Sequence, residues 1–171
     1  DKNTLSIFTS QNPAENGTNG STKTITYEDN IPTADYQNFT ADANNSSAQY
    51  NFNYKHDFNK EGSNIELEVD RNVFESDNPV AFTYPIPQDT KNYEDMNEAD
   101  RKRTTVNLDY VNPITENSKL ELGAEARLFN TLILFSSTGE SVDSRGNFGP
   151  APDTAFDYTR DIYSLYATYG N

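Results

Sequence analysis

Clustered carboxylates are the side chains of this sequence that are best suited to chemistry. The segment KNYEDMNEADRKR, residues 91–103, holds Glu94, Asp95, Glu98 and Asp100. Carboxylate oxygens are the ligands that hard cations such as Ca²⁺ prefer, but a calcium-binding loop needs the order D-x-D-x-D-G, which this segment lacks. We therefore predict a solvated acidic loop and no metal site.

The residue arrangements of known catalytic sites are not found either. His56 is the single histidine, and no cysteine or second histidine accompanies it for a metal site or a catalytic triad. Gly-rich phosphate loops, nucleophile elbows and paired catalytic carboxylates do not occur in the sequence. We expect no catalytic residue, no cofactor and no enzymatic activity.

The charge balance limits the partners. Asp and Glu number 27 against 13 Lys and Arg, which gives a formal net charge of -14. Binding to the phosphates of nucleic acids requires a basic stripe, so nucleic acid is not an expected partner.

A second set of charged residues alternates with apolar ones, and this alternation predicts the strands that position them. In VNLDYVNPITENSKLELGAEARLF, residues 106–129, the charged residues are Asp109, Glu121, Glu125 and Arg127. Successive side chains of a strand point to opposite sides of its sheet. The stretch therefore reads as a hairpin with a turn at NPITENS, one apolar face and one charged face.

The same hairpin pattern occurs more than once. YNFNYKHDF, the turn NKEGS and NIELEVDRNVF form an earlier copy, and a third copy begins at DYTRDIYSLYATY. No long segment shows helical periodicity, so the chain is predicted to be all-β. Strands are expected at about residues 4–10, 46–58, 64–75, 103–112, 119–135 and 158–170.

Long polar segments separate the hairpins, at residues 12–45, 76–102 and 136–156. Short turns and long segments alternate along the chain, so the turns should gather at one end of the sheet and the long loops at the other. No apolar run approaches the roughly 18 residues of a transmembrane helix. The pattern is typical of an outer-membrane barrel with short periplasmic turns and long extracellular loops, and it predicts an antiparallel up-and-down meander that forms part of one.

A family resemblance supports this prediction. LDYVNPITENSKLELGAEARLFNT, followed by a polar loop and FDYTRDIYSLYATY, resembles the barrel segments of TonB-dependent receptors and their relatives in Bacteroidota. The likeness covers about residues 46–170, whereas residues 1–45 match loosely. It implies a bacterial outer-membrane barrel of about 22 strands with an N-terminal plug, which imports a scarce nutrient such as a glycan or siderophore.

The resemblance also implies partners. These are the lipid of the outer membrane, the protein's own plug domain and remaining barrel strands, TonB as the energy source, and a surface lipoprotein. On this interpretation residues 1–171 are a partial barrel of about six strands, a piece of a longer chain from which the plug and any TonB-contacting box are missing.

Periodicity and resemblance together assign the two faces. The residues predicted to face lipid are Phe52, Tyr54, Ile65, Leu67, Val69, Val106, Leu108, Tyr110, Leu120, Leu122 and Leu128. The residues predicted to face the lumen are Asp109, Glu121, Glu125 and Arg127. Phe82 and Tyr84, in the proline-rich segment NPVAFTYPIPQ, are possible loop contacts with a ligand or partner, unless this loop folds back on its neighbours.

Alternatives stay open at this point. Apolar faces of period two also suit a soluble, surface-exposed β-sandwich that serves in binding or adhesion, and a barrel relative that does not transport would share the strand pattern. Arg71 lies on an apolar face, which suits lipid contact only near the membrane rim. Tyrosines near strand ends fit an aromatic girdle or simply the β-propensity of Tyr; they are Tyr54, Tyr110, Tyr158, Tyr163, Tyr166 and Tyr169.

Overall fold

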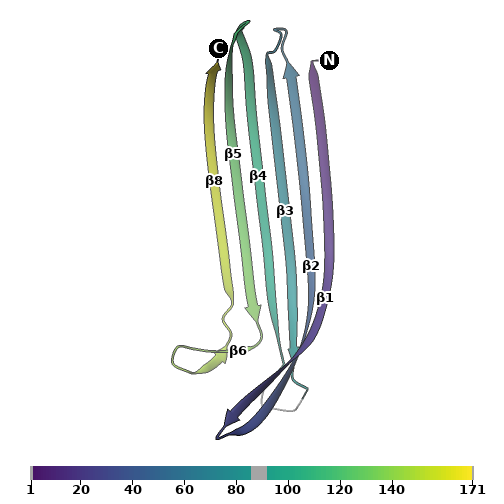
Figure 1. The fold of residues 1–171 in the computed structure, drawn as a ribbon, viewed down its shortest axis with the longest axis vertical. Coiled ribbons are helices and arrows are strands. Elements are labelled where there is room, and N and C mark those ends of the chain that lie inside the picture. The colour runs from purple at the N-terminus through teal and green to yellow at the C-terminus, as the bar shows by residue number, and fades with distance from the viewer. Residues whose placement is uncertain (1, 86–91, 171) are drawn as a thin grey trace.

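A computed structural model describes residues 2–85 and 92–170. Its strands are β1 (Asn3–Glu28), β2 (Ile31–Asp57), β3 (Asn64–Thr83), β4 (Tyr93–Thr115), β5 (Ser118–Ser137), β6 (Glu140–Val142), β7 (Phe148–Pro150) and β8 (Thr154–Gly170). Six of them form one antiparallel sheet in the order β1-β2-β3-β4-β5-β8, and β6 pairs with β7 in a small separate hairpin (Figure 1). The predicted antiparallel meander is confirmed. None of the described residues belongs to a helix that is long and apolar enough to cross a membrane.

The strands are much longer than predicted, because the long polar segments are largely strand. β1 and β2 pair without interruption to their common turn, where Asp29 and Asn30 have φ angles of 50° and 65°. Positive φ at both positions is the geometry of a two-residue type I′ turn, which Asn and Asp tolerate well. Asn, Ser and Gly favour loops locally, but the ladder to the neighbouring strand satisfies backbone N–H and C=O groups whatever the side chains are.

The other two predicted loops are shortened in the same way. β3 continues to Thr83, and β4 already begins at Tyr93, so the predicted acidic loop is part of a strand. The connection from β5 to β8 contains the β6–β7 hairpin.

The two ends of the sheet differ in character. The turns after β2 and β4 are short, and we call their end the short-turn end. At the opposite, long-connection end lie the β6–β7 hairpin and a two-stranded extension of β1 and β2, which continues past the last pair with β3, Asn38 with Thr83, and bends away from the sheet (Figure 1). The segments at this end therefore reach beyond the sheet as predicted, although the β1–β2 connection is a paired hairpin with a two-residue turn and not a loop.

The sheet is a single layer without a core. Within the described ranges, no hydrophobic side chain is fully buried, and Leu108, Leu122 and Leu165 are 42%, 40% and 86% exposed. A soluble sandwich would bury one face of this sheet against a second one. That alternative is wrong for this chain, because its six long strands all belong to the same sheet.

Candidate functional site

One face of the sheet is apolar over the half nearer the short turns. Residues directly opposite each other on neighbouring strands share a face, and Tyr54, Leu67, Leu108 and Ala124 form one such row across four strands. The same register places all eleven predicted lipid-facing residues on this side, which we call the apolar face. A shallow apolar groove of about 350 Å³ runs over Ala124 between Leu108 and Leu165.

Tyrosines border only part of this face. Tyr54, Tyr110 and Tyr169 lie on the apolar face near the short-turn end, as an aromatic girdle requires. Tyr158 and Tyr166 lie on the opposite face, because each is an even-numbered residue of β8, whose odd-numbered residues pair with the apolar positions of β5. Of the two interpretations left open for the six tyrosines, the aromatic girdle is therefore wrong for these two.

The apolar face becomes acidic toward the long-connection end. Glu75 lies directly opposite Asp100, and Asp77 lies opposite Glu98, around a hollow of about 260 Å³. Lys102 forms an ion pair with Asp100 at 2.5 Å between Nζ and Oδ2. Residues 2–85 and 92–170 contain no cluster of carboxylates or His arranged to hold a metal ion.

The opposite, polar face carries all four residues predicted to face the lumen. Asp109, Glu121, Glu125 and Arg127 lie on it, and Arg127 donates to Glu125 at 2.8 Å. Lys119 pairs with Glu121 at 2.5 Å. Glu121, Glu125 and Arg127 thus take part in ion pairs along β5, whereas Asp109 lies on the neighbouring strand β4.

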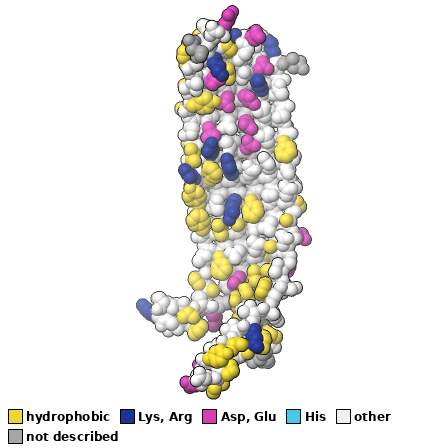
Figure 2. Space-filling model, in the orientation of Figure 1, with side chains coloured by type: hydrophobic (Ala, Val, Ile, Leu, Met, Phe, Trp, Pro, Cys, Tyr) yellow, Lys and Arg dark blue, Asp and Glu magenta, His cyan; other side chains and the backbone are white. Residues whose placement is uncertain are grey.

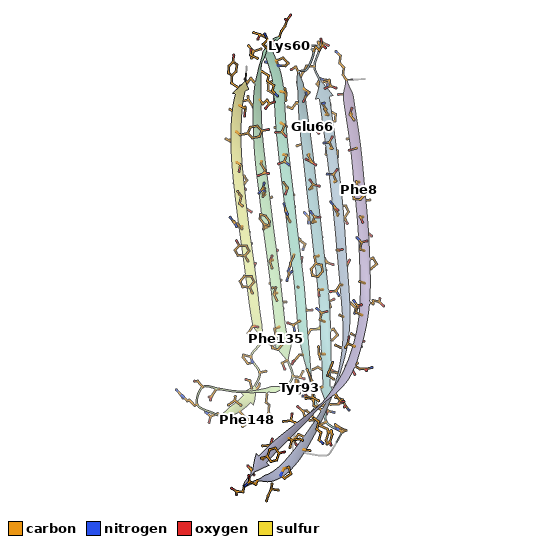
Figure 3. The ribbon with its side chains drawn as sticks, in the orientation of Figure 1. Phe8, Lys60, Glu66, Tyr93, Phe135 and Phe148 are labelled. Atoms are coloured by element: carbon orange, nitrogen blue, oxygen red, sulfur yellow. The ribbon has the colours of Figure 1, made fainter. Side chains whose placement is uncertain are left out.

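Most carboxylates and the arginines of the polar face gather in different parts of it. The carboxylates that lie toward the short-turn end are Glu66, Glu68, Asp70, Asp109, Glu121 and Glu125. The arginines begin with Arg127, in the row of Asp70, and continue toward the other end with Arg101, Arg103 and Arg160. Two lysines, Lys55 and Lys119, lie among the carboxylates. Figure 2 shows acidic side chains in the upper half together with some basic ones, and a group of basic side chains below them; Figure 3 labels Glu66 in the same upper half.

Asparagine side-chain amides donate hydrogen bonds to carboxylates of the acidic half. Asn53 donates to Glu66 at 2.6 Å, and Asn51 donates to Asp70 at 2.9 Å across the β2–β3 pair. Hydrogen bonds from neutral donors of this kind stabilise carboxylates that crowd on neighbouring strands.

Tyr166 reaches across two strands of the polar face. Its ring lies over Gly123, its direct partner on β5, and its hydroxyl donates to Asp109 on β4. A Cβ atom at position 123 would lie 2.0 Å from the ring. Glycine is therefore the residue that leaves room for this ring, an arrangement known as aromatic rescue of a strand glycine.

Below the acidic half, two arginines of β4 stack on phenylalanines of the neighbouring strands. The Cζ atom of Arg101 lies 5.7 Å from the ring centre of Phe74, and that of Arg103 lies 5.6 Å from the ring centre of Phe129. We call these four residues the basic–aromatic patch. It was not predicted from the sequence, because only the register shows that each arginine faces a phenylalanine.

The predicted loop contacts Phe82 and Tyr84 fold back on neighbouring residues at the long-connection end. Phe82 stacks on Tyr93 with ring centres 4.6 Å apart, and Gln37 donates to the Tyr84 hydroxyl at 2.8 Å. Figure 3 labels Tyr93 at this end. Partial burial raises the pKa of the Tyr93 hydroxyl above its ordinary value of 10.0. Contact of Phe82 and Tyr84 with a ligand stays a prediction, and residues 86–88 of their segment lie outside the described residues.

Comparison with known proteins agrees with this geometry. Residues 56–171 match the model of the outer membrane protein beta-barrel family, which covers more than half of the chain. No curated protein matches the chain. In that family's architecture an antiparallel sheet alternates apolar and polar side chains and has short and long connections at opposite ends, as found here. The chain is therefore a member of the outer membrane protein beta-barrel family and belongs to the bacterial outer membrane.

Proposed function

We propose that this chain forms part of the wall of a TonB-dependent receptor of the Bacteroidota type, which imports a nutrient such as a glycan or siderophore. The observation that carries the proposal is the division of the sheet into a short-turn end and a long-connection end, together with its family membership. Receptors that capture scarce solutes need long outer segments to bind them. The protein acts as a transporter and performs no catalysis in this proposal.

The proposed function assigns an environment to each face of the sheet. The apolar face contacts lipid, since its apolar stretch on β5, from Leu120 to Leu128, is close to the about 9–11 residues that a tilted transmembrane strand needs. Arg71 lies opposite Thr104, in the row that contains Leu128, and so at the outer rim of this stretch, where its charge can reach the interface. The polar face lines the lumen, and the short-turn end lies in the periplasm.

The partners proposed are those that such a receptor needs. Outer-membrane lipid covers the apolar face, and further barrel strands cover the free edges of β1 and β8. A plug domain contacts the polar face, TonB supplies energy to the plug, and a surface lipoprotein meets the long-connection end.

The test is a deletion of the full-length gene in its native bacterium. Growth and uptake are measured with individual glycans and ferric siderophores as limiting nutrients, in parallel with a strain that lacks TonB. We expect the two strains to lose uptake of the same nutrient, and a plasmid copy of the gene to restore it only when TonB is present. Unchanged uptake of every nutrient in the gene-deletion strain would show that the barrel does not transport them.

A further inference from the structure

The basic–aromatic patch differs from the rest of the polar face in its unpaired positive charge. Arg101 and Arg103 are exposed, and neither forms an ion pair with a described residue, whereas Arg127 pairs with Glu125. The rows that contain Arg101 and Arg103 hold no carboxylate on any of the neighbouring strands β2, β3 and β5. The two guanidinium groups are therefore positive charges without a neighbouring carboxylate, in a chain that is acidic as a whole.

The phenylalanines hold these guanidinium groups in position. Stacking of an arginine on an aromatic ring uses the flat face of the guanidinium and leaves the N–H groups at its edge available to an anion. The two arginines are two residues apart on β4, so their Cα atoms lie about 6.6 Å apart and both side chains point to one side. Arg160, directly opposite Phe129 on β8, adds a third exposed cation beside them.

A hollow of about 420 Å³ opens between the arginines and strands β1 to β3. Besides the patch, its polar lining includes Asn12, Gln49, Asn72 and Thr131. This volume lies within the range of small-molecule sites, about 300–1,000 Å³, and amide and hydroxyl groups suit the hydroxyls of a small polar solute. Charge and size together indicate a small anionic ligand.

We propose that the basic–aromatic patch binds an oxyanion group, a sulfate, carboxylate or phosphate, carried by a small ring-containing solute on its way through the barrel. Arg101 and Arg103 bind the oxyanion through charge-assisted hydrogen bonds, and the amides of the hollow bind the ring substituents. The inference rests on the proposed transport function, in which the polar face lines the lumen, and it narrows the imported nutrient to anionic solutes.

The test is a titration of the full-length protein in detergent with three probes: N-acetylglucosamine 6-sulfate, N-acetylglucosamine and inorganic sulfate. Binding is measured by calorimetry for the wild type, for Arg101→Gln and Arg103→Gln, and for Arg71→Gln. The last variant is the control, because it removes the same charge from the apolar face.

We expect the sulfated sugar to bind the wild type at least about tenfold more tightly than either other probe, since hydrogen bonds to charged groups contribute differences of this size. Arg101→Gln and Arg103→Gln should each weaken this binding about tenfold, and Arg71→Gln should leave it unchanged. Absence of binding to the wild type would overturn the proposal. Inorganic sulfate that binds as tightly as the sulfated sugar, or equal weakening by Arg71→Gln, would overturn it as well.

This titration requires neither TonB nor a membrane potential. If the deletion experiment contradicts transport, an oxyanion site measured by titration would therefore still stand. Conversely, TonB-dependent uptake of a neutral nutrient together with a negative titration would contradict the oxyanion site and support transport.

Discussion

At the scale of single residues, Gly123 shows how one missing side chain organises the polar face. The Tyr166 ring occupies the space over this glycine and donates a hydrogen bond to Asp109. The contact joins β4, β5 and β8, so it links three strands through side chains as well as through backbone ladders.

Substitution Gly123→Ala should destabilise the folded barrel. The new methyl group displaces the ring and breaks its hydrogen bond to Asp109, and overpacking of this kind costs about 1–3 kcal/mol. The measurement is the urea midpoint of the full-length protein refolded in detergent. Gly149→Ala is the control, because nothing lies within 4 Å of a Cβ atom there, and equal midpoints for both variants would contradict the role of Gly123.

Asp143 organises the turn of the β6–β7 hairpin. Its carboxylate accepts hydrogen bonds from the backbone N–H groups of Asn147 and Arg145, at 2.9 and 2.8 Å. The Asn147 side chain donates to the second oxygen at 3.0 Å. These hydrogen bonds, those from Asn147 first, lower the pKa of Asp143 below its ordinary value of 3.8.

The lowered pKa predicts a pH dependence for this turn. A depressed carboxyl pKa stabilises the folded turn fully above the ordinary value of 3.8, and the stabilisation is lost as the pH falls through the lower, folded value. Amide NMR shifts of Arg145 and Asn147 should therefore stay constant from pH 7 to about 5 and change only in the acid range below that. In Asp143→Asn this acid transition should disappear, and a transition that persists would assign it to another group.

At the scale of elements, the period of two along each strand decides which side chains share the apolar face. Leu108 and Asn107 are neighbours on β4, but Leu108 belongs to the apolar row that includes Ala124, whereas Asn107 lies opposite Glu68 and Glu125 on the polar face. Ala124 is at the middle of the apolar stretch of β5 that ends at Leu120 and Leu128.

Arginine at these two neighbouring positions should have opposite consequences. Leu108→Arg should cost about 2–4 kcal/mol, the cost of an arginine near the bilayer midplane, whereas Asn107→Arg places its charge between two carboxylates and should be tolerated. Folding yield and urea stability of the full-length protein in lipid vesicles measure the difference. Two equally stable variants would contradict lipid contact by the apolar face.

The hairpins could be predicted from the sequence, whereas the strand lengths could not. Alternation of apolar and polar residues in the segments 50–74 and 106–129 predicted which of the residues named as lipid-facing or lumen-facing share a face of the sheet. Between residues 12 and 45 the sequence contains turn-forming residues without clear alternation, yet β1 and β2 pair throughout. Strand formation there depends on the ladder with a partner strand, which local preferences do not encode.

At the scale of the whole molecule, a single-layer sheet with two free edges needs neighbours. β1 and β8 each pair on one side only, and large apolar side chains on one face are exposed. Open edges and apolar surface of this extent favour association with other chains.

Residues 1–171 expressed alone should therefore aggregate in buffer without detergent. Light scattering and size-exclusion chromatography provide the measurement, with the full-length protein in detergent as the control. A monomeric, soluble and folded 171-residue chain would contradict the assignment of these strands to a barrel wall.

The sequence by itself determined the strand class, the two faces and the outer-membrane character of this protein, because these depend on a local period of two and on the order of turns. Only the tertiary structure decided which residues of different strands meet. The stacking of Arg101 and Arg103 on Phe74 and Phe129, the Tyr166 ring over Gly123 and the unbroken β1–β2 ladder all depend on register. Register brings together residues that are distant in sequence, and the pattern within one strand does not contain that information.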